Sequence, residues 1–364
     1  MKLINVCGAR PNFMKIAPLM HAYRAFPAIE PLLVHTGQHY DQKMSQLFFD
    51  ELQIPRPDIN LEVGSGSHAQ QTAAIMQRFE TVVLEHKPDA VLVVGDVNST
   101  IACALVAAKL GVGVFHVEAG LRSFDRTMPE EINRVLTDAI SDLLFVSEPS
   151  GLENLRREGV PDEKIHFVGN VMIDTLERNR GKAESSQILS QLGVEPRQYV
   201  VVTMHRPAAV DNPEIMAHLA DVFDEIQRDL PVIFPIHPRT RKCLATAGLD
   251  TRYAGMKNLQ LIEPVGYLDF LKLTSHAAVV MTDSGGIQEE TTILGVPCLT
   301  LRENTERPVT IDQGTNQLVG LDPDRIRAAY RTIRTAPPGA PRRPEGWDGH
   351  AAERIARIIA DWRQ

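Results

Sequence analysis

Three acidic side chains stand where predicted strands or helices begin or end. Asp96 follows the apolar run "AVLVV" in the segment "GDVNST", and Glu118 directly follows "VFHV". Glu131 lies further along, in the charged segment "HVEAGLRSFDRTMPEEINR". Carboxylates that project from strand ends can take and give protons when a ligand binds there. These three residues are therefore the first candidates for acid–base chemistry.

Structural roles compete with this interpretation at two of the positions. Asp96 could cap the helix that follows it, although Asn98 or Ser99 could cap that helix equally well. No helix is predicted to begin at Glu118, so a capping role does not explain it. A carboxylate at the end of a buried strand needs a partner, and Arg122 could neutralise it.

The helix start "TMPEEINR" explains one of its two glutamates. Thr127 and Glu130 fit the T-x-x-E capping box, and Pro129 suits the first turn. Glu130 can also pair with Arg134 one turn later. Glu131 points about 100° away around the helix and is left without a structural role.

Cations follow the first predicted strand, in "GARPNFMK". Arg10 and Lys15 lie near a predicted helix N-terminus, and together they suit a phosphate or pyrophosphate. The alternative is a turn with two solvated bases. The segment is not GxGxxG, so the dinucleotide-binding fingerprint is missing.

A second anion site is predicted in the other half of the chain. In "MTDSGGIQEE", Ser284, Gly285 and Gly286 lead from a strand into a helix, and such small residues let backbone N–H groups face an anion. Glu290 comes one turn later and could accept hydrogen bonds from ribose hydroxyls. Arg307, in "LRENTERPVT", is expected near the same edge.

Histidines also end two strands in this half. His205 and Arg206 follow one strand in "VTMHRP", and His237 follows another in "PIHPRTR". A single histidine at a strand end is more often structural than chemical. No HExxH, EF-hand, GxSxG or P-loop motif is present, and no metal or cofactor is expected.

The elements that position these residues form two alternating series. Apolar runs separated by helical stretches are typical of parallel sheets covered on both faces. The predicted strands are 3–8, 31–37, 89–96, 113–120, 143–148 and 165–170, then 199–205, 231–237, 258–264, 277–286 and 296–302. The predicted helices are 15–26, 42–51, 70–86, 98–110, 129–141, 149–158, 213–229, 239–246, 267–275, 286–294 and 351–363.

This pattern predicts an α/β protein with two Rossmann-like, doubly wound domains and an interdomain cleft. The expected N-terminal domain spans 1–170 and carries the carboxylates, and the expected C-terminal domain spans 171–349. The helix within 350–364 is expected to pack back on the first domain. A nucleotide diphosphate whose other end meets acid–base groups suits such a cleft.

Composition excludes several classes of protein. The 364 residues carry 38 Lys and Arg against 46 Asp and Glu, a net charge of −8, so nucleic-acid binding is not expected. The longest apolar run, 101–108, is too short to span a bilayer. The N-terminus resembles a first strand rather than a signal peptide, which predicts a cytoplasmic protein.

The motifs "GARPNFMKIAPL", "GDVNST", "HVEAGLRSFDRTMPEEINR", "DSGGIQEE" and "RENTERP" together resemble the non-hydrolysing UDP-N-acetylglucosamine 2-epimerases. The resemblance covers nearly the whole chain, with the motifs in the same order and spacing. It implies the two-domain glycosyltransferase-B fold, a homodimer, and interconversion of UDP-GlcNAc and UDP-ManNAc without an added redox cofactor. The implied route is elimination of UDP to a 2-acetamidoglucal, followed by re-addition.

The resemblance also assigns residues. Asp96, Glu118 and Glu131 match the family's catalytic acids, and His205 is grouped with them. Arg10, Lys15 and His205 match groups near the diphosphate. The UDP contacts are matched by Ser284, Gly285, Gly286, Glu290 and Arg307, and Phe270 is expected beside the uracil.

Some bacterial members carry a second, activating UDP-GlcNAc site. Gln38, Arg206 and His237 match parts of it, whereas Gln70 stands where that site has an arginine. The wording "TGQHYD" also occurs in relatives that act on UDP-2,3-diacetamido-2,3-dideoxyglucuronate, so this substrate is a second candidate. A hydrolysing epimerase and a glycosyltransferase of the same fold remain rival assignments.

Overall fold

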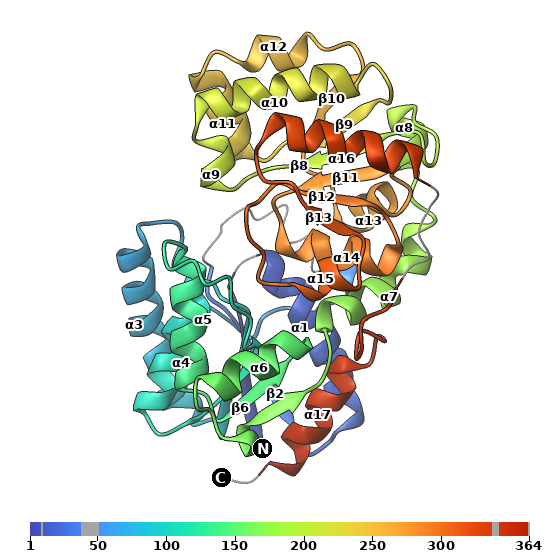
Figure 1. Cartoon of the computed structure of the whole chain (residues 1–364). Coiled ribbons are helices and arrows are strands. Elements are labelled where there is room, and N and C mark those ends of the chain that lie inside the picture. The colour runs from blue at the N-terminus through green and yellow to red at the C-terminus, as the bar shows by residue number, and fades with distance from the viewer. Residues whose placement is uncertain (9, 38–50, 337–341, 363–364) are drawn as a thin grey trace. The chain divides into compact units, whose positions relative to one another are not determined.

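The computed structural model describes residues 1–8, 10–37, 51–336 and 342–362, and of Arg10 and Pro11 it describes only the backbone. The chain divides into two compact units (Figure 1). Unit 1 comprises Met1–Arg178 and Glu345–Gln364, and unit 2 comprises Asn179–Pro344. The division falls within helix α7, Val171–Ala183.

Unit 1 is built on a parallel sheet. Within the described residues it has seven strands in the order β3-β2-β1-β4-β5-β6-β7. The order reverses at β1 and β4, which is the switch point of a doubly wound sheet. The strands are β1 Lys2–Cys7, β2 Glu30–His35, β3 Ile59–Asn60, β4 Ala90–Val94, β5 Gly113–Ala119, β6 Leu143–Val146 and β7 Ile165–Phe167.

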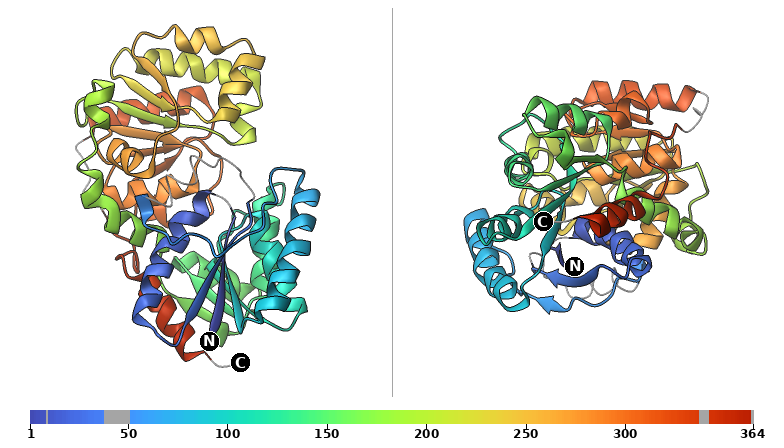
Figure 2. Two further views of the ribbon diagram at one scale, coloured as in Figure 1. Left: turned by 180° about the vertical axis from the view of Figure 1, so that it is seen from behind. Right: turned by 90° about the horizontal axis from the view of Figure 1, so that it is seen from below.

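Helices cover both faces of this sheet, which explains why its strands are continuous apolar runs. Figure 2 (left) shows α3 and α4 on one side of the strands and α1 and α17 on the other. On the first side, Phe79 of α3 and Ala104 of α4 belong to one buried cluster with Ile4 and Val91 of the strands. The helices are α1 Arg10–Ala22, α3 His68–His86, α4 Asn98–Lys109, α5 Pro129–Ala139, α6 Pro149–Arg157 and α17 Ala351–Asp361.

The segment after 344 contacts unit 1 along its length. The indole of Trp347 is buried and donates to the carbonyl of Ser147 at 2.8 Å. Asp174 accepts the backbone N–H groups of Ala351 and Ala352 at 3.1 and 2.7 Å, which caps α17. Unit 1 therefore combines both ends of the sequence.

Unit 2 repeats the plan with a second parallel sheet. Its order within the described residues is β10-β9-β8-β11-β12-β13. The strands are β8 Val200–Thr203, β9 Val232–Pro235, β10 Leu259–Ile262, β11 Val279–Thr282, β12 Cys298–Thr300 and β13 Asn316–Leu318. The helices are α8 Ile188–Leu192, α9 Pro207–Val210, α10 Pro213–Ile226, α11 Pro238–Thr246, α12 Asp250–Ala254, α13 Tyr267–Ser275, α14 Gly285–Leu294, α15 Val309–Asp312 and α16 Pro323–Thr335.

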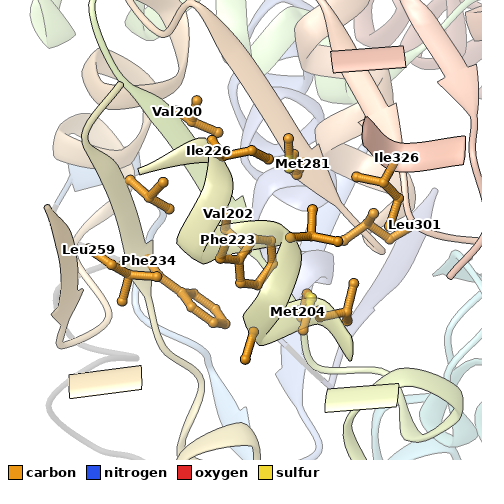
Figure 3. Packing of buried hydrophobic residues seen from close by; sticks show 14 of the residues in the cluster. Val200, Val202, Met204, Phe223, Ile226, Phe234, Leu259, Met281, Leu301 and Ile326 are labelled. Carbon is orange, nitrogen blue, oxygen red and sulfur yellow. The ribbon is translucent and has the colours of Figure 1, made fainter. Parts of the chain in front are cut away.

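The core of unit 2 lies between this sheet and α10 and α16. Figure 3 shows Phe223 and Ile226 of α10 packed with Val200 and Val202 of β8 and with Ile326 of α16. Successive strand residues point to opposite faces, so Val201 is buried on the other side. Burial on both faces keeps the strand ends at fixed positions, where the site residues begin.

The predicted fold class is confirmed by these two doubly wound sheets. Every predicted strand is present, whereas β3, β13 and α16 are among the elements that were not predicted. β3 and β13 have two and three residues and are too short to show a hydrophobic period. The predicted helix 42–51 lies almost wholly outside the described residues. Among the described residues, no helix is long and apolar enough to cross a membrane.

Candidate active site

Glu118 lies at a distortion of strand β5. The register between β5 and β6 shifts between Val117 and Ala119, so Glu118 is the additional residue of a bulge. Its φ is +71°, in the left-handed region that residues other than glycine rarely adopt. Such strain persists only where the surrounding structure imposes it, and it is most frequent at functional sites.

Lys15 of α1 supplies a partner for Glu118. Its ammonium bonds the carboxylate, and both side chains are buried. Gly95, at the end of β4, makes room for this pair, because a Cβ there would lie 2.8 Å from Nζ of Lys15. The prediction that Arg122 pairs with Glu118 was wrong, because Arg122 contacts Asp138 at 2.7 Å and Glu158 at 2.6 Å instead.

Arg134 of α5 joins the other two carboxylates. One guanidinium nitrogen bonds Asp96, and another lies 2.5 Å from Oε2 of Glu131. The side chain of Asp96 is 27% exposed, whereas the side chains of Glu131 and Arg134 are each only 3% exposed. Asp96 is thus the most accessible of the three predicted acids.

Glu131 has a structural role that the sequence did not indicate. Its Oε2 accepts the N–H and hydroxyl of Ser123 at 2.9 and 3.0 Å, and its Oε1 accepts the N–H of Phe124 at 2.9 Å. Glu131 therefore holds the loop that follows Glu118. Its carboxylate is oriented by four donors, counting Arg134.

Helix α5 begins at Pro129 as predicted, but the predicted capping interactions were wrong. The helix N-cap is Met128, without a side-chain cap, and Thr127 donates instead to Asp125 at 2.6 Å. The capping box is therefore not formed, and Arg134 pairs with Glu131 rather than with Glu130. At α4, likewise, the N-cap residue is Val97, not Asp96, Asn98 or Ser99.

In unit 2, the carboxylate of Asp283 organises the end of β8. Its Oδ2 accepts the backbone N–H groups of His205 and Arg206, each at 2.8 Å, and Nδ1 of His205 lies 3.0 Å from Oδ1. Burial by itself would raise the pKa of Asp283, but His205 and the two N–H groups outweigh burial and lower it. Sequence reasoning missed Asp283, although it stands directly before the predicted Ser284.

The predicted anion site is the start of helix α14, where the side chains of Arg307 and Glu306 pack closely against Gly285. Ser284 is the N-cap of α14, and no acidic residue occupies the first turn. A Cβ on Gly285 would lie 2.6 Å from Nη1 of Arg307, so a larger residue would require this guanidinium to shift. Gly286 continues the first turn, whose N–H groups favour an anion.

Arg307 belongs to a buried cluster of ions. It bonds Glu289 through Nε and Glu306 through Nη1, the latter at 2.7 Å. Glu306 also pairs with Arg302 at 2.8 Å, and Arg206 approaches it at 3.8 Å. The cluster fixes the Arg307 side chain next to the start of α14.

Glu290 is buried in α14 and is bonded by the hydroxyl of Tyr267 at 3.1 Å. Burial raises the pKa of Glu290 to about 7, and the Tyr267 bond offsets only part of this rise. Phe270 lies three residues after Tyr267 on α13 and is partly exposed. The predicted ribose and uracil residues thus come from facing helices of one unit.

The remaining predicted residues are placed only in part. The side chains of Arg10 and Gln38 lie outside the described residues. His237 is the N-cap of α11, where Nδ1 accepts the N–H of Arg239 at 3.2 Å, and its ring lies 5.9 Å from that of His205. The regulatory site therefore stays a prediction. Across the described ranges, no cluster of His, Cys, Asp and Glu could hold a metal ion.

Comparisons with known proteins match this chain over nearly its full length. A family model described as UDP-N-acetylglucosamine 2-epimerase matches residues 21–360. The UDP-N-acetylglucosamine 2-epimerase of Methanococcus maripaludis is 46% identical over 327 residues, 88% of each chain. The UDP-2,3-diacetamido-2,3-dideoxy-D-glucuronate 2-epimerase of Pseudomonas aeruginosa is 40% identical over 367 residues, 99% of each chain.

A solved structure agrees in fold as well as in sequence. The crystal structure of Methanocaldococcus jannaschii UDP-GlcNAc 2-epimerase in complex with UDP-GlcNAc and UDP has a TM-score of 0.92 and 43% identity to this chain, and covers 99% of each. Together with the family model, these matches are far above what a shared fold alone requires. The chain therefore belongs to the UDP-N-acetylglucosamine 2-epimerase family of enzymes.

Proposed function

We propose that this enzyme interconverts UDP-GlcNAc and UDP-ManNAc by inverting sugar carbon 2. The observation that carries the proposal is Glu118, held on a left-handed bulge and paired with Lys15 at the carboxyl edge of the unit 1 sheet. Asp96 follows the neighbouring parallel strand, so both acids belong to the same edge. The similarity to enzymes named for this activity supports the same assignment.

The chemistry explains why several acids are needed. The proton on carbon 2 has no adjacent carbonyl to acidify it, so direct exchange would be very slow. In the proposed route a carboxylate removes that proton while the bond from carbon 1 to the UDP oxygen breaks, and UDP leaves with the electron pair. Re-addition of UDP to the 2-acetamidoglucal, with protonation on the opposite face, gives the epimer.

We propose different roles for the three carboxylates. Asp96 and Glu118 are the proposed proton-transfer groups on carbon 2, since they follow adjacent strands and each is paired with a cation, Arg134 or Lys15 respectively. Glu131 is engaged by four donors, which suits orientation of the loop and of Arg134 better than proton transfer. Lys15 and Arg134 can stabilise negative charge that develops during elimination.

The residues of unit 2 are proposed to hold the nucleotide. Ser284, Gly285 and Gly286 offer N–H groups to a phosphate at the start of α14, beside Arg307. Glu290 and Phe270 are proposed for the ribose and the uracil. His205, held by Asp283, is proposed beside the diphosphate, with Arg10 and Lys15 contributing positive charge.

A second candidate substrate is UDP-2,3-diacetamido-2,3-dideoxyglucuronate. The Pseudomonas aeruginosa relative named for this substrate is 40% identical over 99% of both chains, close to the values for the relatives named for UDP-GlcNAc. The same elimination and re-addition would serve it, because carbon 2 carries the same acetamido group. From the family resemblance we also propose that the protein is a cytoplasmic homodimer. Light scattering of the purified protein tests the oligomeric state.

The test is proton NMR of the purified protein in deuterated water with each sugar nucleotide separately. We expect UDP-ManNAc signals to appear and deuterium to replace the proton on carbon 2. A hydrolysing epimerase would instead accumulate free ManNAc with UDP, and a glycosyltransferase would leave the carbon 2 proton in place. Absence of exchange with both sugar nucleotides would contradict the proposal.

A further inference from the structure

The proposed mechanism leaves a buried charged array in unit 1 without a role. It comprises His116 of β5, Asp138 of α5 and Arg122 of the loop after β5. Less than 2% of each side chain is exposed. At its outer end, Glu158 pairs with Arg122 and is 35% exposed. His116 lies two residues before Glu118, Arg122 lies four residues after it, and Glu158 is the C-cap of α6.

Both ring nitrogens of His116 face oxygen atoms. Nδ1 lies 2.6 Å from Oδ1 of Asp138, and Nε2 lies 2.8 Å from the carbonyl oxygen of Gly95. A carbonyl oxygen can only accept, so Nε2 donates. Burial alone would raise the pKa of Asp138, but its contacts with His116 and Arg122 outweigh burial and lower it. Both ring nitrogens of His116 are therefore engaged by protein atoms, which fixes the orientation of the ring.

Stability alone does not explain such an array. Removing charges from water is costly, and well-packed apolar side chains often replace a buried ion group without loss. Apolar side chains cannot replace direction. His116 and Arg122 each donate to a backbone carbonyl, of Gly95 and Leu121 respectively, and Asp138 accepts a backbone N–H. The array therefore fixes backbone positions that packing alone would leave less well defined.

The backbone atoms that the array reaches lie on both sides of Glu118. Oδ2 of Asp138 accepts the N–H of Gly120 at 3.0 Å, which fixes the chain after the bulge. His116 fixes the carbonyl of Gly95, whose own N–H bonds the carbonyl of Val117 at 3.0 Å, directly before the bulge. Gly120 has φ +80° and packs against the backbone of Gly151 in helix α6, so it cannot shift toward α6.

We propose that His116 and Asp138 are positioning residues that hold Glu118 in its left-handed bulge, with its carboxylate directed at Lys15. This inference rests on the proposed role of Glu118 in proton transfer. It predicts that damage to the array acts on turnover through Glu118 rather than through substrate binding.

Asp138→Asn is the direct test, because it keeps the size of the side chain and removes its charge. We expect kcat to fall about 100-fold, the loss typical of a reacting group displaced by about 1 Å, with KM within about twofold of wild type. The matched control is Asp142→Asn, since Asp142 accepts the N–H of Val114 at 3.0 Å at the opposite end of the same strand. We expect the control to keep its kcat.

A double-mutant cycle separates positioning from general damage. In a Glu118→Gln background, Asp138→Asn should lower the residual rate by less than about twofold, because the group it positions is already gone. A further loss of about 100-fold in that background would overturn the inference. So would a normal kcat for Asp138→Asn in the otherwise unchanged enzyme.

Histidine variants keep the inference testable if Asp138→Asn does not fold. An Asn amide nitrogen reaches the position of Nδ1, and a Gln amide nitrogen reaches that of Nε2. His116→Asn therefore keeps the contact with Asp138, and His116→Gln keeps the contact with Gly95. We expect each to lower kcat about tenfold with KM unchanged, and a normal kcat in both would overturn the inference.

Failure of the proposed function is recognised separately. If the wild-type enzyme does not exchange carbon 2 of either sugar nucleotide, the assignment of the reaction fails. Crystal structures of wild type and Asp138→Asn then decide the positioning role by themselves. Glu118 should leave the left-handed region in the variant, and an unchanged Glu118 φ in both would overturn the inference.

Discussion

Both units contain a buried aspartate that contacts a histidine and accepts backbone N–H bonds, one at Asp138 and two at Asp283, but the two histidines differ in exposure. Asp138 in unit 1 pairs with His116, which is completely buried and bonded at both nitrogens. Asp283 in unit 2 lies 3.0 Å from Nδ1 of His205, whose side chain is 45% exposed. One pair is closed within the protein, and the other presents an imidazole at the surface of its unit.

The comparison separates two uses of the same contact. In unit 1 both nitrogens of the imidazole bond protein atoms, which suits a scaffold for Glu118. In unit 2 the aspartate orients the ring through Nδ1, and the exposed part of the ring is available to a ligand. The pKa of both aspartates is lowered, because their partners outweigh burial, so both are charged at neutral pH.

The largest loss of kcat is expected for the two proposed proton-transfer residues, Glu118, which the His116–Asp138 pair supports, and Asp96. Glu118→Gln and Asp96→Asn should each lower kcat by about 1,000-fold or more, since proton transfer contributes about 100- to 10,000-fold. The affinity for UDP, measured by calorimetry, should stay within about twofold because neither carboxylate is a proposed UDP contact. Near-normal turnover in both variants would remove the catalytic assignment.

A smaller effect is expected at the open pair. His205→Asn keeps a donor near Asp283, and His205→Gln places its amide where Nε2 stands. If the exposed nitrogen meets the diphosphate, His205→Asn should lower kcat/KM by about 30-fold, and His205→Gln by less than about fivefold. Equal losses in steady-state assays of both variants would show that the exposed edge has no separate role.

Two buried carboxyls of unit 2 differ in the direction of their pKa shift, which is downward for Asp283 and upward for Glu290. The pKa of Glu290 is raised from 4.5 to about 7 by burial, so its charged form destabilises the fold. The penalty is absent below about pH 4.5, grows between pH 4.5 and 7, and is complete above pH 7. Glu290→Gln should therefore gain on the order of 3 kcal/mol at about pH 8 and nothing near pH 4.5. Denaturant unfolding at the two pH values measures this difference, and an equal gain at both would contradict it.

The smallest effect on kcat is expected for Glu130, the residue directly before Glu131. Glu130→Gln should leave kcat within about twofold, because Glu130 is not the glutamate that bonds Ser123, Phe124 and Arg134. Glu131→Gln should lower kcat by at least about 100-fold, since it loosens the loop after Glu118. A matched pair of assays on the two variants checks this, and similar rates would show that the loop needs no such anchor.

Much of the fold was predictable because parallel strands buried on both faces leave long apolar runs. Strand ends then located Asp96, Glu118, His205 and Ser284 without any knowledge of contacts. The short strands β3 and β13 were missed, since two or three residues carry no period. The capping box at Thr127 was wrong because Asp125, two residues earlier, binds the threonine hydroxyl instead.

The amino-acid sequence by itself determined which residue types follow each strand and, through the resemblance, the family. Only the tertiary structure decided how the charges pair. Lys15 reaches Glu118 across 103 positions, and Arg134 reaches Asp96 across 38. Ion pairs form between groups that are close in space, whereas Arg122, the partner suggested for Glu118, is close only in sequence. The left-handed bulge and the buried His116–Asp138 pair likewise arise from contacts between elements, which local patterns do not record.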